Sequence, residues 1–107
     1  MRPVAQEFAS AEVSRTARHL AKLVHQARLA RRMPQAELAL RARTSVATLH
    51  RIEHGAVETS LGTWLSVMEQ VGLLKPVAEL QDPTSAALVE QHKARRARRP
   101  TRTDMDF

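Results

Sequence analysis

The sequence of 107 residues predicts an all-α domain of roughly four to five helices, followed by a polar tail. Apolar residues recur at three- and four-residue steps in several segments, which is the spacing of one face of a helix. Ser, Thr, Pro and Gly stand at the ends of these segments, where helices commonly begin and stop. We therefore expect one helical domain over residues 12–74, after a flexible N-terminal segment of residues 1–11.

The first helix is predicted over Glu12–Arg32, with an apolar stripe made by Val13, Ala17, Leu20, Val24, Ala27 and Leu29. Pro34 stands where the next helix would begin, since the N–H that proline lacks has no helical partner in a first turn. That second helix is predicted over Gln35–Ala42, and it should bury Leu38 and Ala39.

The third helix is predicted over Val46–Glu53, because Thr44 or Ser45 can supply an N-cap oxygen and Gly55 can close the far end. A fourth helix, capped by Thr59 or Ser60, is expected through Val71 and is ended by Gly72; its apolar face is Leu61, Trp64, Leu65, Met68 and Val71.

The segment after Gly72 changes in character. Leu73–Gln81 has partial alternation of apolar and polar residues and contains a Pro, which fits either a short edge strand or a frayed extension of the preceding helix. A strand over residues 75–82 would leave backbone groups unpaired, so it would pair with its counterpart in a second copy. Residues 83–107 are predicted to be a basic, largely disordered tail, in which Ser85–His92 could form a short helix.

The stretch Gln35–Gly55 has the pattern of a helix, a tight turn and a second helix. Ala39 is small enough to allow two helices to cross closely. On the second helix, three apolar anchors at three-residue steps are predicted, namely Val46, Leu49 and Ile52. The free face would then carry Ser45, Ala47, Thr48, His50 and Arg51. This pattern is typical of a helix-turn-helix that places its second helix in the major groove of DNA.

The distribution of charge supports a polyanionic partner. The chain has 17 Lys and Arg against 11 Asp and Glu, for a net charge of +6. Between residues 15 and 51 the only acid is Glu37, and the bases are Arg15, Arg18, Lys22, Arg28, Arg31, Arg32, Arg41, Arg43 and Arg51. Between residues 58 and 90 the only base is Lys75. One end of the molecule should therefore attract phosphates, although a merely solvated basic surface has the same composition.

Individual contacts with DNA can be predicted from this arrangement. Arg51 could donate two hydrogen bonds to guanine O6 and N7, while Gln35 starts its helix where a phosphate would lie. Val46 and Ala47 would contact thymine methyl groups, and core packing is the alternative for Val46.

The segment from Leu20 to Leu73 resembles the phage repressor/Cro (XRE) helix-turn-helix family. The residues that carry the resemblance are Leu20, Val24, Arg28, Gln35, Leu38, Ala39, Ile52, Glu53 and Gly55. The resemblance implies a salt bridge between Arg28 and Glu53 that orients the first helix near a DNA phosphate; a solvated Arg28 is the alternative. Arg43 stands where the family usually has Gly, so either the turn is adjusted or Arg43 takes a strained conformation and gains a phosphate contact.

The predicted helix over residues 61–71, the predicted strand after it and the terminal Phe107 also resemble the HipB-like antitoxins within this family. That resemblance implies a homodimer that binds a pseudo-palindromic operator and represses its own operon. It also implies a HipA-type kinase toxin as partner, with Phe107 as an anchor for the toxin. A Phe107 with no role is the alternative.

The tail contains a basic run of Lys93, Arg95, Arg96, Arg98 and Arg99. Such a run can enter a minor groove or lie along phosphates. It could equally bind an acidic patch on a protein, or act only to keep the chain soluble.

Other classes of function are less well supported. The chain has no Cys, so it has no disulfide or thiolate chemistry. His50, Glu53 and His54 have the spacing of an inverted zinc-peptidase motif, but a third ligand and a large scaffold are missing. We expect no enzyme activity, no metal and no cofactor, and a cytoplasmic, nucleoid-associated protein without a membrane segment. The main rival is a protein-interaction module, either toxin-neutralising or scaffolding, with only non-specific affinity for DNA.

Overall fold

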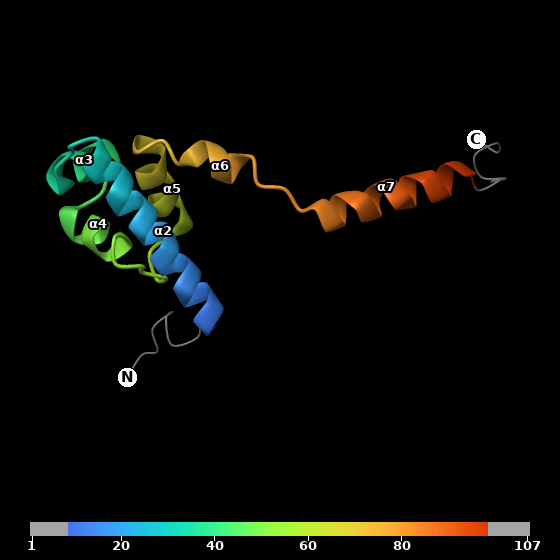
Figure 1. Cartoon of the computed structure of the whole chain (residues 1–107), viewed down its shortest axis with the longest axis horizontal. Coiled ribbons are helices and arrows are strands. Elements are labelled where there is room, and N and C mark those ends of the chain that lie inside the picture. Colours follow the sequence, from blue (N-terminus) through green and yellow to red (C-terminus); the bar gives the residue numbers. More distant parts are fainter. Residues whose placement is uncertain (1–8, 99–107) are drawn as a thin grey trace.

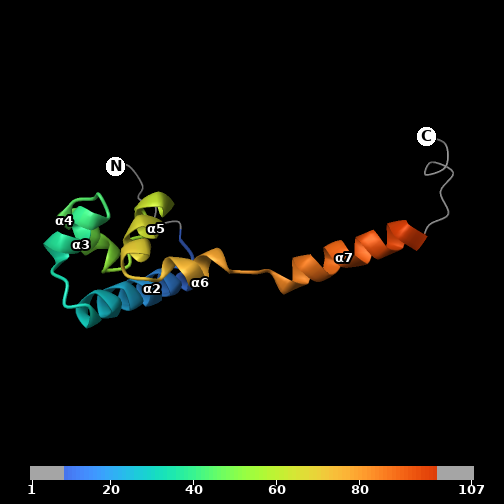
Figure 2. The same ribbon diagram turned by 90° about the horizontal axis from the view of Figure 1, so that it is seen from above.

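A computed structural model describes residues 9–98, and in this part of the chain every element of regular secondary structure is an α-helix, which agrees with the predicted all-α class (Figure 1). Its helices are α2 (Ala11–Ala30), α3 (Gln35–Arg41), α4 (Val46–Ile52), α5 (Leu61–Gln70), α6 (Leu74–Ala78) and α7 (Pro83–Arg98). Helices α2 to α5 pack around one core, α6 follows α5, and α7 projects away from the others (Figures 1 and 2). The predicted N-terminal segment lies mostly outside the described residues, but its end is ordered, because Ser10 caps α2 and Ala11 already belongs to the helix.

The long helix α2 begins where the hydroxyl of Ser10 accepts a hydrogen bond from the N–H of Val13 at 3.0 Å. Its inner face carries Ala21, Val24 and Arg28, with Leu20 and Ala27 packed at the edges. The predicted apolar stripe is wrong at its two ends, since Val13 and Leu29 are each 53% exposed. The sequence pattern predicted that Leu29 would be buried, but its neighbour Arg28 is buried instead.

The core is formed mainly by side chains from α3, α4 and α5 that close over α2. Its fully buried members are Val24, Leu38, Leu49, Ile52, Val67 and Val71. On α5 the predicted face is right for Trp64, whose indole N–H donates to the carbonyl of Ala56 at 3.1 Å. Leu61, however, is 72% exposed, and the pattern missed Val67.

The strand predicted over residues 75–82 is wrong, because Leu74–Ala78 is a short helix that ends in a turn at Glu79, and residues 80–82 have no regular secondary structure. Pro76 is compatible with this helix, since it lies in the first turn, where an N–H has no helical partner. Gly72 turns the chain from α5 into α6 with a φ of +78°, and Leu73 N–H closes the turn onto the carbonyl of Met68 at 2.8 Å.

The tail is more ordered than predicted over its first part, since α7 spans Pro83–Arg98 and so extends beyond the short helix expected at Ser85–His92. Asp82 starts this helix by accepting hydrogen bonds from the N–H of Ser85 at 3.1 Å and from its hydroxyl at 2.6 Å. These bonds lower the pKa of Asp82. No residue of α7 is buried. Arg99 and Phe107 lie outside the described residues.

Candidate nucleic-acid interface

Helices α3 and α4 are joined by a tight turn with a defined hydrogen-bond pattern. The N–H of Arg43 donates to the carbonyl of Leu40 at 3.2 Å, and the N–H of Thr44 donates to the carbonyl of Ala39 at 2.9 Å. This is the arrangement that ends a helix on a left-handed residue. Arg43 is that residue, with a φ of +59°. Of the two alternatives, the structure therefore has the strained Arg43 and not an adjusted turn.

Replacing Arg43 with glycine should therefore stabilise the domain. Relieving the strain of a non-glycine residue at a positive φ should stabilise the folded state by about 1–2 kcal/mol. The greater conformational entropy of glycine in the unfolded chain offsets about 0.4–1 kcal/mol of that gain. Urea denaturation should show a net increase of roughly 0.5–1 kcal/mol in the free energy of unfolding. A loss of stability would mean that the side chain of Arg43 makes a contact worth more than the strain. If Arg43 also contacts a phosphate, the same variant should bind DNA less tightly.

Helix α4 is fixed to the core along one side and exposed along the other. The hydroxyl of Ser45 caps the helix by accepting the N–H of Thr48 at 3.0 Å, as predicted. Leu49 and Ile52 are fully buried anchors. Val46 is not an anchor, since it is 45% exposed, so the core-packing alternative for this residue is wrong. The outer side of α4 carries Ser45, Val46, Ala47, His50 and Arg51, with Thr48 partly covered.

Side chains on this exposed surface hold one another in place. A guanidinium nitrogen of Arg51 donates to the hydroxyl of Thr48 at 3.0 Å, and Ser45 donates to the same hydroxyl at 2.9 Å. One turn later, the rings of His50 and His54 lie 4.1 Å apart. The surface thus combines a positioned cation with small and apolar side chains, which is the chemistry needed to contact base edges.

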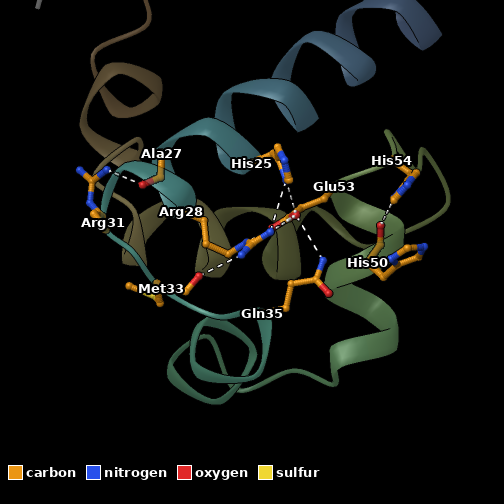
Figure 3. Close-up of polar contacts among 9 residues, drawn as sticks. All are labelled: His25, Ala27, Arg28, Arg31, Met33, Gln35, His50, Glu53 and His54. Carbon is orange, nitrogen blue, oxygen red and sulfur yellow. Dashed lines mark hydrogen bonds and ion pairs between the residues drawn. The ribbon is translucent and has the colours of Figure 1, made fainter.

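A polar cluster lies behind α4 and connects it to α2 and α3 (Figure 3). Glu53 follows directly after α4, and its carboxylate accepts two hydrogen bonds from Arg28, at 2.7 and 3.0 Å. Arg28 also donates to the carbonyl of Met33 at 2.9 Å. The side chain of Arg28 is 9% exposed and that of Glu53 is 2% exposed. Arg28 is therefore not the solvated arginine of the alternative.

Two further side chains complete this cluster. Nδ1 of His25 lies 2.9 Å from the Glu53 carboxylate, a contact that sequence reasoning missed. His25 stands three residues before Arg28 and so shares its helix face, which is the spacing that would have indicated the contact. Gln35, predicted to meet a phosphate, instead donates its amide N–H to Glu53 at 3.3 Å.

The environment of Glu53 has two opposing effects on its pKa. Burial by itself raises the pKa of the carboxyl group, because it disfavours the charged form. Hydrogen bonds to Arg28, His25 and Gln35 favour the carboxylate and outweigh burial, so the pKa of Glu53 is lowered from its ordinary value of 4.5. Glu53 is thus a charged, fixed acceptor at neutral pH.

The remaining predicted site residues lie elsewhere. Lys93, Arg95, Arg96 and Arg98 are exposed on α7, away from α4 (Figure 1). The carboxylate of Glu53 is directed to Arg28 rather than to a metal shared with His50 and His54 (Figure 3). Among residues 9–98, no three His, Cys, Asp or Glu side chains are grouped closely enough to hold a metal ion.

No family model matches this chain, and neither does any curated protein or solved structure. Within the described part of the chain, no helix has the length and apolar character required to cross a bilayer.

Proposed function

We propose that this protein is a sequence-specific DNA-binding repressor with a repressor/Cro-type helix-turn-helix, in which α4 enters the major groove. The observation that carries the proposal is the exposed side of α4, where Thr48 holds the guanidinium of Arg51 at 3.0 Å. A guanidinium whose position is already fixed pays less entropy when it forms a bidentate contact with guanine.

The other exposed side chains of α4 and of the turn before it also have roles in this proposal. Val46 and Ala47, which are exposed, would contact thymine methyl groups. Ser45 and His50 can exchange hydrogen bonds with bases or phosphates. Arg43, which is exposed in the left-handed turn before α4, would contact the phosphate backbone.

The role of Arg28 and Glu53 is to fix the direction of α4. Their ion pair joins the end of α4 to α2 and is almost completely shielded from water. Gln35 belongs to the same network, so its proposed role changes from a phosphate contact to support of the carboxylate.

As a repressor, the protein would act as a homodimer on a pseudo-palindromic operator. Two copies of α4 would then lie about 34 Å apart, which is one turn of DNA. Occupation of the promoter would block transcription sterically, with no cofactor or enzymatic step, and the protein would be cytoplasmic and associated with the nucleoid. The helical α6 removes the strand that supported a HipB-like branch, so a HipA-type kinase toxin as partner rests on the remaining sequence resemblance. A kinase-like reading frame directly downstream of the gene would support it.

The test is a fluorescence-anisotropy titration with the DNA upstream of the gene and with a scrambled duplex, at two salt concentrations. We expect the native duplex to bind more tightly. Arg51→Ala and Arg51→Lys should each raise the Kd for the native duplex by about 5- to 150-fold, since a bidentate guanine contact is worth about 1–3 kcal/mol. Arg51→Lys keeps the charge, so it should lose sequence preference while its salt dependence stays nearly unchanged.

Lys75→Ala is the matched control, because it removes an exposed cation on α6 rather than on α4. It should leave the preference for the native duplex intact. Equal, salt-sensitive binding of both duplexes by the unmodified protein would overturn the proposal and favour a protein-interaction module with only electrostatic affinity for DNA.

A further inference from the structure

An apolar groove runs along the domain between the first half of α2, the loop before α5, and α5 itself. It encloses about 600 Å³, and its lining includes Val13, Leu20, Val57, Leu61, Leu65 and Val77. Val13 is 53% exposed and Leu61 is 72% exposed. Such apolar side chains gathered around a hollow indicate a surface that is covered in the working form of the protein.

Helix α7, like the groove, lacks a packing partner among the described residues. It has 16 residues, none of them buried, and it exposes Leu88 and Val89 to 48% and 49%. An isolated helix of this length is only marginally stable in water, and most helices in proteins depend on packing. Helix α7 therefore needs an apolar surface of the kind that the groove offers.

The charges of the two elements are complementary. Glu12 lines the groove, and Glu58 stands between the lining residues Val57 and Thr59. The last turn of α7 carries Arg95, Arg96 and Arg98. A helix that inserts Leu88 and Val89 into the groove would bring these cations near the acidic rim.

The direction of the chain argues against α7 filling the groove of its own subunit. Val77 of α6 already lies at the edge of that groove. From there the chain continues outward, and α7 points away from the domain in both views (Figures 1 and 2). Asp82 fixes the start of α7 through its two hydrogen bonds from Ser85.

We infer that α7 of each subunit lies in the groove of a second copy, so that two chains exchange their C-terminal helices in a two-fold symmetric dimer. The exchange is reciprocal, as a two-fold interface requires, and it covers both grooves at once. It identifies the surface behind the homodimer of the proposed function, and it can be measured without DNA.

Cross-linking can test this arrangement cleanly because the chain has no Cys of its own. Leu61→Cys and Leu88→Cys variants are prepared separately, mixed and oxidised, and the products are separated without reductant. We expect a disulfide-linked dimer in the mixture and little from either variant alone. Leu40→Cys is the matched control, because Leu40 is 78% exposed on α3, outside the groove, and it should not cross-link to Leu88→Cys.

Sedimentation of the intact protein without DNA gives an independent measurement. The unmodified chain should be a dimer, and Leu61→Glu should raise its dimer dissociation constant by roughly tenfold or more, because a charge would enter an apolar contact. Leu40→Glu should leave the dimer unchanged.

Three outcomes would overturn the inference. A monomeric unmodified chain would do so, as would a dimer that is indifferent to Leu61→Glu. An intrachain disulfide in the Leu61→Cys/Leu88→Cys double variant would show that α7 folds onto its own domain. None of these results depends on the Arg51 titration, so the dimer surface and the DNA-binding proposal can fail separately.

Discussion

Replacing Arg28 with methionine is expected to destabilise the domain by about 3–5 kcal/mol, because it leaves the Glu53 carboxylate buried without its main partner. Methionine keeps most of the volume of the side chain but removes the bonds to Glu53 and to the carbonyl of Met33. Small domains are stable by only about 5–15 kcal/mol in total, so a large fraction of the protein should unfold at moderate urea. The measurement is urea denaturation followed by circular dichroism.

Glu53→Gln and the Arg28→Met/Glu53→Gln double variant separate the ion pair from the packing of Arg28. If the two residues act through each other, the double variant should be less destabilised than the sum of the single changes. Strictly additive effects would mean that the pair contributes nothing beyond volume.

The same cluster gives stability a defined dependence on pH. The pKa of Glu53 is lower in the folded protein than its ordinary value of 4.5, so folding favours the carboxylate. The resulting stability is fully present above pH 4.5 and is lost as the pH falls through the pKa of the folded protein. Glu53→Gln lacks this contribution, so its free energy of unfolding should fall less steeply with acid than that of the unmodified protein.

Replacing Gly55 with alanine is the second change with a large expected effect. Gly55 has a φ of +83°, and a Cβ built there would lie 2.8 Å from Cγ of Arg18 and 3.1 Å from its Cα. The side chain of Arg18 can move, but its backbone belongs to α2 and cannot move without separating α2 from α4. Left-handed strain costs about 1–2 kcal/mol and overpacking about 1–3 kcal/mol, so we expect a loss of roughly 2–5 kcal/mol.

Gly62→Ala is the matched control, because it makes the same chemical change where no atom lies within 4 Å of the added Cβ. Gly62 is the second residue of α5, so alanine should stabilise the helix there by up to about 0.5–1 kcal/mol, the value for the middle of a helix. Thermal unfolding of the two variants should shift the midpoint in opposite directions. Equal shifts would contradict the close approach of α2 to the turn at Gly55.

Local patterns predicted the helices of the domain well, since their signals lie within a few residues. Ser45 and Ser60 cap α4 and α5 as expected, and Pro34 and Gly72 mark helix ends. The positive φ of Arg43 is one of the two alternatives that the family resemblance left open, because the family usually has Gly at this position.

What the residues alone could not predict depends on contacts between distant segments. A periodic pattern treats Arg28 as polar and Leu29 as apolar, yet the carboxylate of Glu53, which lies 25 residues away, reverses their burial. Gln35 also donates a hydrogen bond to this carboxylate, which replaces the phosphate contact predicted for it. The error over residues 75–82 is of another kind, because the signals that favour a helix there are local: the turn at Gly72 and the position of Pro76 in a first helical turn.

The carboxylate of Glu53 is hydrogen-bonded by side chains from two other helices, His25 and Arg28 on α2 and Gln35 on α3. Three helices therefore share a single electrostatic hub, and none of them can rotate without breaking bonds to the others. Because of this shared network, the three helices should move and unfold as one cooperative unit rather than independently. The exposed side of α4 therefore keeps one orientation relative to α2 and α3. Little conformational entropy is then lost when a ligand binds to it.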